Sequence, residues 1–429
     1  MIGQHAHTIA TRSEAPSGAP GIATPHAVKP LDGLRALAAL SVLFYHSYGM
    51  DAYHKHFLGW DITIAWYYMQ TGVHLFFVLS GFLLFLPFAR ALLCGTPRPS
   101  TRAFYRRRAL RMLPAYWVCL ALLALFQWSS LATPLGLANI ASHVVLLHDL
   151  VPDFNRAIEG PFWTLALEAQ FYLLLPLLAW GIARVVGASR STPRLCAAVV
   201  GLIVATLGLR ELDAWAQQML PHLHGVAATL ATAFVILTLG SQGKFLEVFG
   251  VGMLCATLYV AFGEQRAADA QRVRMVGWSL LALAVTLMVV VAPLAFEQHV
   301  DAPNHTLVTD PLNLAVICGP LLIGLGYGAL LLAILWAGPL LRAPFEFQPL
   351  VFIGLMSYSL YLWHLPFVHA LVPGFAGVPV PMRVATAFAA AYLSYRLVEV
   401  PFLRRRQRVP PTSARTAEHA ATRRAGEAH

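Results

Sequence analysis

Long apolar segments separated by polar segments recur along the chain between residues 31 and 401. A helix of about 20 apolar residues is long enough to cross a bilayer. The pattern predicts ten spans, at residues 31–50, 68–93, 105–126, 161–186, 195–209, 245–262, 276–296, 312–336, 350–371 and 382–401. We therefore expect an all-α fold, a polytopic transmembrane helical bundle of about ten spans.

The number of spans depends on one further apolar run, at residues 226–240. Arginines gather in the segments that follow the second, fourth, sixth and eighth spans, whereas the opposite segments carry few basic residues. Because basic residues mark cytoplasmic loops, this alternation predicts that both termini are cytoplasmic. A crossing at 226–240 would invert every later loop and place three arginines outside. We therefore expect this run to be re-entrant or interfacial.

Polar tails flank the membrane domain that we predict for residues 30–402. Residues 1–29 are polar and lack the apolar core that a cleavable signal peptide needs, so the first span is expected to act as its own insertion signal. We expect these residues to form a disordered cytoplasmic tail. Residues 403–429 begin with LRRRQR and are expected to form a basic, disordered cytoplasmic tail beside anionic lipid.

Composition supports a membrane protein and narrows its chemistry. Hydrophobic residues make up 58% of the chain and charged residues only 12%, about half the share in a soluble domain. The net charge of +10 is concentrated in the loops, so it indicates topology, and we expect no nucleic-acid partner. The five cysteines include no CxxC pair and have no histidine at metal-ligand spacing, so we expect no metal cofactor.

The first predicted span carries two strongly polar side chains, Arg35 and His46. They are 11 residues apart, close to three helical turns, so they share one helix face about 16 Å apart along the axis. Intramembrane Arg and His residues are energetically costly and usually face a bundle interior, which favours a functional role. The alternative is that Arg35 extends to a lipid headgroup and that His46 is an interfacial histidine with its hydrogen bonds satisfied.

Four titratable residues fall at a similar depth in the outer part of the predicted bundle: His46, His74, Glu168 and His364. A carboxylate beside imidazoles suits general base chemistry, because it orients the ring that takes the proton. For His364, a hydrogen-bonded core histidine is an equal alternative. Proton-coupled transporters also use such layers, but they usually show repeat symmetry, which we do not find in this sequence.

A cluster of arginines occupies the predicted cytoplasmic side. Arg35 lies there, and it is joined by Arg106, Arg107, Arg108 and Arg111. Because guanidinium groups bind phosphate in a bidentate manner, converging arginines favour a phosphorylated ligand. The alternative is that a basic run at a cytoplasmic helix end is an ordinary topology signal.

Seven motifs occur in order from residue 31 to residue 406. The motifs are LDGLRALAALSVLFYH, GVHLFFVLSGFLL, FYRRRALRMLPAYW, GPFWTLALEAQFYLLLPLL, FLEVFGVGMLCATLY, MSYSLYLWHLP and SYRLVEVPFLRRR. Together they resemble the motifs of the acyltransferase 3 family of integral-membrane acyltransferases. Each motif alone is weak, but seven in order are specific.

The resemblance implies transfer of an acyl group, commonly acetyl, from cytoplasmic acyl-CoA to a hydroxyl of a saccharide acceptor. On this basis we expect His46 and Glu168 to be catalytic. The arginines named above would bind the CoA phosphates. The residues expected near the acceptor are Trp163, Tyr172, His74, Tyr361 and His364. Three positions depart from the family pattern: Thr164 replaces a serine, Ala169 replaces a second glutamate, and His74 stands where an acidic residue is common.

The acceptor and the location follow from the same resemblance. We expect an integral protein of a bacterial cytoplasmic (inner) membrane, in contact with membrane lipid. A lipid-linked saccharide is the first expectation for the acceptor, because no esterase-like domain is recognised after residue 402. A small glycosylated or macrolide metabolite is the second. The alternative from another class is a carrier that exports a product without chemistry.

Overall fold

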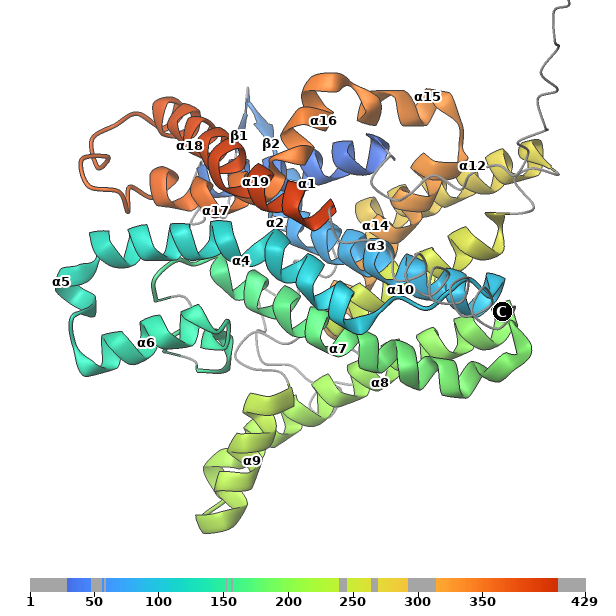
Figure 1. Cartoon of the computed structure of the whole chain (residues 1–429), viewed down its shortest axis with the longest axis horizontal. Helices are drawn as coiled ribbons and strands as arrows, with labels where there is room; N and C mark the ends of the chain where they lie inside the picture. The colour runs from blue at the N-terminus through green and yellow to red at the C-terminus, as the bar shows by residue number, and fades with distance from the viewer. Residues whose placement is uncertain are drawn as a thin grey trace, which may run out of the picture.

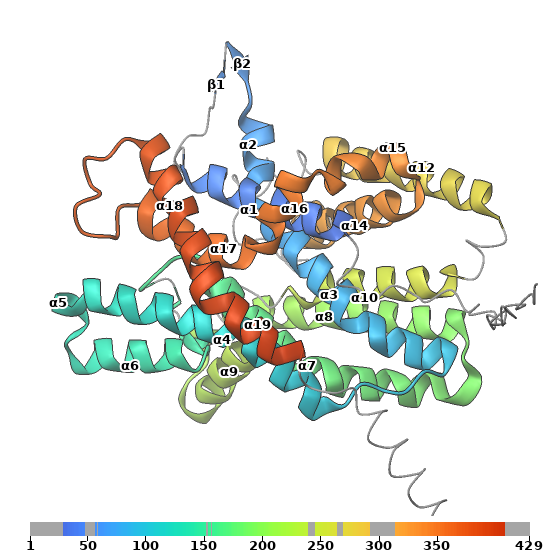
Figure 2. The same ribbon diagram turned by 45° about the horizontal axis from the view of Figure 1, so that its top comes forward.

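The computed structural model describes residues 29–47, 56–57, 59–151, 153–155, 157–238, 245–263, 269–291 and 314–407. These residues form a bundle of helices (Figure 1). Within them, β structure is limited to one antiparallel pair, β1 (His56–Phe57) and β2 (Trp60–Asp61), which projects beside α2 (Thr63–Gln70) in Figure 2. The all-α fold class is therefore confirmed.

The helices follow the predicted apolar segments, and several segments are divided into two or more helices. The longer helices are α1 (Lys29–Ser47), α3 (Gly72–Cys94), α4 (Thr101–Phe126), α6 (Pro134–Val144), α7 (Phe162–Val186), α8 (Thr192–Met219), α9 (Gly225–Thr238), α10 (Leu246–Ala261), α12 (Ala270–Thr286), α14 (Leu314–Trp336), α17 (Ser357–Val368) and α18 (Val380–Ser394). The shorter ones are α5 (Trp128–Leu131), η2 (His148–Leu150), η3 (Gly187–Ser189), η4 (Leu220–His222), η5 (Leu287–Val291), α15 (Pro339–Arg342), η6 (Ala343–Glu346), α16 (Gln348–Leu355), η7 (Tyr395–Glu399) and α19 (Val400–Gln407).

Six helical segments in the described part of the chain are long and apolar enough to cross a membrane. A seventh span results if α16 and α17, which meet at an angle of 74°, are counted together. The first predicted span does not qualify by this measure because α1 carries Lys29, Asp32 and Arg35, and α10 is only 16 residues long. The count of ten spans and the cytoplasmic termini stay predictions.

Two other predictions concern segments at the margins of the bundle. The apolar run at 226–240 is helical as far as Thr238, as α9, which extends away from the other helices in Figure 1. Its re-entrant or interfacial placement stays a prediction. The predicted C-terminal tail begins as helix, because α19 continues to Gln407. The other tail residues, 1–28 and 408–429, lie outside the described residues.

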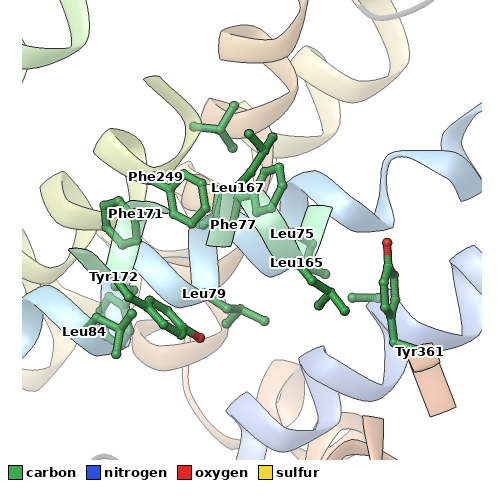
Figure 3. Close-up of a cluster of buried hydrophobic side chains, with 14 of the residues drawn as sticks. Leu75, Phe77, Leu79, Leu84, Leu165, Leu167, Phe171, Tyr172, Phe249 and Tyr361 are labelled. Carbon is green, nitrogen blue, oxygen red and sulfur yellow. The ribbon is translucent and has the colours of Figure 1, made fainter. Parts of the chain in front are cut away.

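Helix α3 lies in the core of the bundle, packed against α1, α7, α10 and α14. Stacked rings join three of these helices: Phe249 of α10 lies 4.6 Å from Phe77 of α3 and 4.1 Å from Phe171 of α7, measured between ring centroids (Figure 3). Helix α1 packs along α16 and α17. These contacts place the polar residues of α1, α3, α7 and α17 toward one another.

Close contact between α3 and α10 depends on glycine. A Cβ atom added to Gly252 would overlap the carbonyl oxygen of Val78 on α3, so only glycine allows this approach. We expect Gly252→Ala to reduce the free energy of unfolding by about 1–3 kcal/mol, because the backbones must separate. A thermal melt in detergent measures this loss. Gly201→Ala on α8 is the matched control: nothing lies within 4 Å of its added Cβ, so it should not lower the melting temperature.

Candidate active site

One cavity, which we call the arginine cavity, lies between α1, α3, α4, α7 and α17. Its volume, which includes space open to the exterior, is about 830 Å³. Its polar lining residues are Arg35, Ser80, Arg108, Arg111, Thr164, Glu168, Tyr172, Ser357, Tyr358 and Tyr361. Three guanidinium groups therefore converge on one internal space.

The three arginines differ in their partners. Arg35 donates to Asp32 at 2.7 Å, and Arg111 lies 3.6 Å from Glu399. Among the described residues, Arg108 makes no ion pair and its Nε atom has no hydrogen-bond acceptor, although its guanidinium lies 5.9 Å from the centre of the Tyr172 ring. Of the three arginines, Arg108 therefore has the greatest unused capacity to bind an anion.

The predicted arginine cluster divides between two faces of α4. Arg108 and Arg111 are three residues apart, so they share one face and line the cavity. Arg106 is exposed and Arg107 is half-buried, and neither belongs to the cavity lining. The helical period thus separates two residues that face the cavity from two that do not.

Glu168 lies in the arginine cavity. Its Oε1 atom accepts hydrogen bonds from Ser80 of α3, at 2.8 Å, and from Tyr172 one turn later on α7. The carboxylate is therefore held on the side of Arg108 and Arg111, and in the described residues its hydrogen-bond partners are hydroxyl groups rather than an imidazole. Figure 3 shows Tyr172 and Tyr361 with Leu79 and Leu165 between them, all four from the lining of this cavity.

A second cavity, which we call the histidine cavity, lies toward the other end of α1. Its volume, which includes space open to the exterior, is about 1140 Å³. Its polar or aromatic lining residues are Tyr45, His46, Gln70, Gln127, Glu159, Trp163, Thr164, Tyr361 and His369. Arg35 and His46, the two polar residues of the first predicted span, therefore line different cavities.

His46 is held by its own helix and by a second histidine. Its Nδ1 atom lies 2.8 Å from the carbonyl oxygen of Val42, which can only accept, so Nδ1 carries the proton and Nε2 the lone pair. By the same reasoning, the Nδ1 atom of His364 donates to the carbonyl of Tyr361 at 2.7 Å. The remaining His364 nitrogen, Nε2, accepts from His46 Nδ1 at 3.3 Å. His364 is buried, and this contact helps to fix the orientation of the His46 ring.

His74 belongs to the lining of neither cavity. Its ring is 5.4 Å from that of Phe245, which in turn lies 5.7 Å from the ring of Trp163.

The predicted site residues divide between the two cavities. The structure brings His46 and His364 together. It places Trp163 and Tyr361 in the histidine cavity, and Glu168 and Tyr172 in the arginine cavity.

The two cavities share three lining residues, Val73, Thr164 and Tyr361, which we call the neck. The hydroxyl oxygens of Thr164 and Tyr361 are 2.7 Å apart, and both hydroxyls lie near the carbonyl of Pro161. Thr164 stands where serine is usual in the family pattern, and it keeps the hydroxyl group. A path from the arginines to His46 would have to pass this hydrogen-bonded pair of side chains.

Sequence reasoning missed five polar residues of the histidine cavity, Tyr45, Gln70, Gln127, Glu159 and His369. A signal existed for His369, because it follows His364 by five residues in the same predicted span. No signal existed for Glu159, because it lies in the loop before α7, whose path is set by packing. No group of three residues suited to hold a metal ion occurs in the described part of the chain.

Outside both cavities, two buried histidines stack on each other near Phe162, the first residue of α7. The rings of His143 and His148 are 3.8 Å apart and inclined by 6°, and both side chains are fully buried. Burial lowers the pKa of His143 to about 4. Burial, with the adjacent His143, lowers the pKa of His148 to about 3. The folded protein therefore holds both rings neutral at pH values where an unfolded histidine is charged.

We expect this pair to make the fold sensitive to acid. Below about pH 6.5 the unfolded chain binds protons that the folded chain excludes, so stability falls as the pH drops toward 4, by about 2 kcal/mol per histidine at pH 5. Melting temperatures at pH 7 and pH 5 measure the loss. His148→Phe keeps a stacked ring without a proton site and should reduce the loss, whereas His222→Phe at an exposed position should not. An unchanged loss in His148→Phe would contradict this interpretation.

The chain matches the family of acyltransferase domains over residues 28–398. It is 25% identical over 399 residues to the peptidoglycan O-acetyltransferase OatA of Listeria monocytogenes, across 87% of this chain and 55% of that protein. It is 24% identical over 405 residues to the O-acetyltransferase OatA of Staphylococcus aureus, across 88% of this chain and 57% of that protein. The chain thus spans somewhat more than half the length of these curated relatives. No solved structure matches it.

Proposed function

The chain belongs to the acyltransferase 3 family, and on that premise we propose that it transfers an acetyl group from cytoplasmic acetyl-CoA to a hydroxyl group of a saccharide. The observation that carries this proposal is that the two cavities share the lining residues Val73, Thr164 and Tyr361. A thioester that passed these residues would reach an imidazole from a cationic site within one bundle.

The donor would bind by its phosphates. Arg35, Arg108 and Arg111 face one cavity, and guanidinium groups bind phosphate through paired N–H donors. Arg106 and Arg107 lie outside the lining, so we restrict the phosphate site to the three arginines that face the cavity. The pantetheine arm would then extend through the neck, with the thioester next to Thr164 and Tyr361.

His46 would act as the general base. Its Nε2 atom takes the proton of the acceptor hydroxyl while the hydroxyl oxygen attacks the thioester carbonyl. As the carbon–sulfur bond breaks, the CoA thiolate receives that proton from His46, which leaves an O-acetyl ester and free CoA. His364 is a positioning residue in this scheme, because it accepts from Nδ1 and so fixes the ring and its tautomer.

Glu168 would act on the donor side of the neck. Held by Ser80 and Tyr172, its carboxylate offsets part of the positive charge of Arg108 and Arg111 and keeps the Tyr172 hydroxyl in the cavity lining. This role differs from the predicted one, in which Glu168 orients His46.

The acceptor would occupy the histidine cavity. Trp163 offers an aromatic wall, and Gln127 and His369 offer polar groups, a combination that suits the apolar and hydroxyl-bearing surfaces of a sugar ring. The two relatives are named as O-acetyltransferases, one of them for peptidoglycan, which supports a saccharide over a macrolide.

Transfer can be tested in proteoliposomes that contain the purified protein, acetyl-CoA labelled in the acetyl group, and glycans extracted from membranes of the producing cells. We expect label to appear in the glycans as an ester that mild alkali releases. Label that remains in acetyl-CoA would overturn the proposal. Label found only in a small extractable metabolite would replace the saccharide by the second expected acceptor.

A further inference from the structure

A buried carboxyl group without a hydrogen-bond partner in the described residues belongs to a residue in the wall of the histidine cavity. Glu159 is 1% exposed, and neither of its carboxyl oxygens has a hydrogen-bond partner among the residues that the structure describes. It lines the cavity together with His46, Trp163 and Gln127. Buried polar atoms are normally paired, so two unpaired oxygens at a cavity wall indicate a place where a ligand supplies the partner.

The backbone around Glu159 is fixed on both sides. Gln127, at the end of α4, donates from Nε2 to the carbonyl of Ile158 at 3.0 Å. The amide of Phe162 donates to the carbonyl of Glu159 at 3.3 Å, and the neck hydroxyls of Thr164 and Tyr361 lie near the carbonyl of Pro161. The segment that carries the carboxyl group is therefore hydrogen-bonded to the neck residues Thr164 and Tyr361.

Burial favours the neutral form of this carboxyl group. Burial raises the pKa of Glu159 well above its ordinary value. An ionised carboxylate in this position would cost several kcal/mol, because in the described part of the chain no cation pairs with it. A neutral carboxyl group has one O–H donor and a carbonyl acceptor, which matches the donor and acceptor of a hydroxyl group.

We propose that Glu159 is an acceptor-binding residue that hydrogen-bonds a saccharide hydroxyl adjacent to the one that is acetylated. This inference rests on the proposed function and specifies its acceptor as a neutral ring with neighbouring hydroxyl groups. Because Glu159 and His46 line the same cavity, one ring can meet both groups, with the reacting hydroxyl at His46 and its neighbour at Glu159.

The test compares three variants with the wild type in the labelled-acetyl assay, with extracted membrane glycans as acceptor. Glu159→Leu should raise the glycan KM at least tenfold, whereas the KM for acetyl-CoA should stay within twofold. Glu159→Gln keeps one donor and one acceptor and should stay within about threefold of the wild type in both constants. Glu346→Gln, at a partly exposed ion pair with Arg342, is the control for loss of a carboxyl group.

An unchanged glycan KM in Glu159→Leu overturns the proposal. A Glu159→Gln variant as impaired as Glu159→Leu also overturns it, because that result shows that an ionised carboxylate is required, as for an ammonium-bearing acceptor. If Glu159→Leu does not fold, Glu159→Asp withdraws the carboxyl group by one methylene and should also raise the glycan KM selectively. A wild-type protein that transfers no acetyl refutes the proposed function itself, before any variant is compared.

Discussion

Replacing His46 with alanine is expected to lower kcat for acetyl transfer by about 100-fold or more, because a positioned base contributes about 10²–10⁴-fold to such a reaction. His46 has the geometry for this role: its Nδ1 proton is held by Val42 and shared with His364, so the lone pair lies on Nε2. The measurement is the initial rate of label transfer to glycan at saturating acetyl-CoA.

An exposed histidine provides the control. His222→Ala, in η4, should retain the wild-type rate and amount of protein in the membrane. If His46→Ala keeps more than about a tenth of the wild-type kcat, His46 is not the general base. We expect the His46→Ala variant to be expressed and folded, with kcat lowered by about 100-fold or more.

Replacing Arg108 with glutamine is expected to raise the KM for acetyl-CoA by about 10-fold to 100-fold, the cost of losing a charge-assisted phosphate contact of about 1.5–3 kcal/mol. Arg35 and Arg111 each form an ion pair with a carboxylate, whereas Arg108 forms none in the described residues and is offset only by the more distant Glu168. Arg108 should therefore contribute more to donor binding than either. Arg108→Lys should lie between the wild type and glutamine, since lysine keeps the charge but not the planar fork.

The matched control lies on the same helix. Arg102 is exposed in the first turn of α4, so Arg102→Gln should leave the KM for acetyl-CoA unchanged. Equal effects of the two substitutions would mean that the net charge of this membrane face matters and that the cavity does not select a phosphate.

Helix positions were largely predictable, because a long unbroken apolar run leaves the backbone little choice in lipid. The third and fourth predicted spans, 105–126 and 161–186, end at the same residues as α4 and α7. The ninth, 350–371, was predicted as one helix but bends by 74° between α16 and α17. The bend follows packing that the sequence does not display: a Cβ atom on Gly354 would overlap the backbone carbonyl of Asp32 on α1.

The separation of Arg35 from His46 was more predictable than the direction in which the other polar side chains point. Arg35 and His46 are far apart on one helix, and they do reach different cavities. The partners of Glu168 were not predictable, because sequence spacing does not say which neighbouring helix a side chain meets. Packing of α3 beside α7 pairs it with Ser80. The division of the arginine cluster was predictable in principle, because residues 108 and 111 share a helix face.

The central claim is that the arginine and histidine cavities form one path for the acyl group. A cryo-EM map of the protein with a non-hydrolysable thioether analogue of acetyl-CoA tests this directly. We expect the phosphates at Arg35, Arg108 and Arg111, with the acetyl group between Thr164 and Tyr361 and facing His46. An analogue whose acetyl group ends within the arginine cavity, with the hydrogen bond between Thr164 and Tyr361 intact, would contradict the claim.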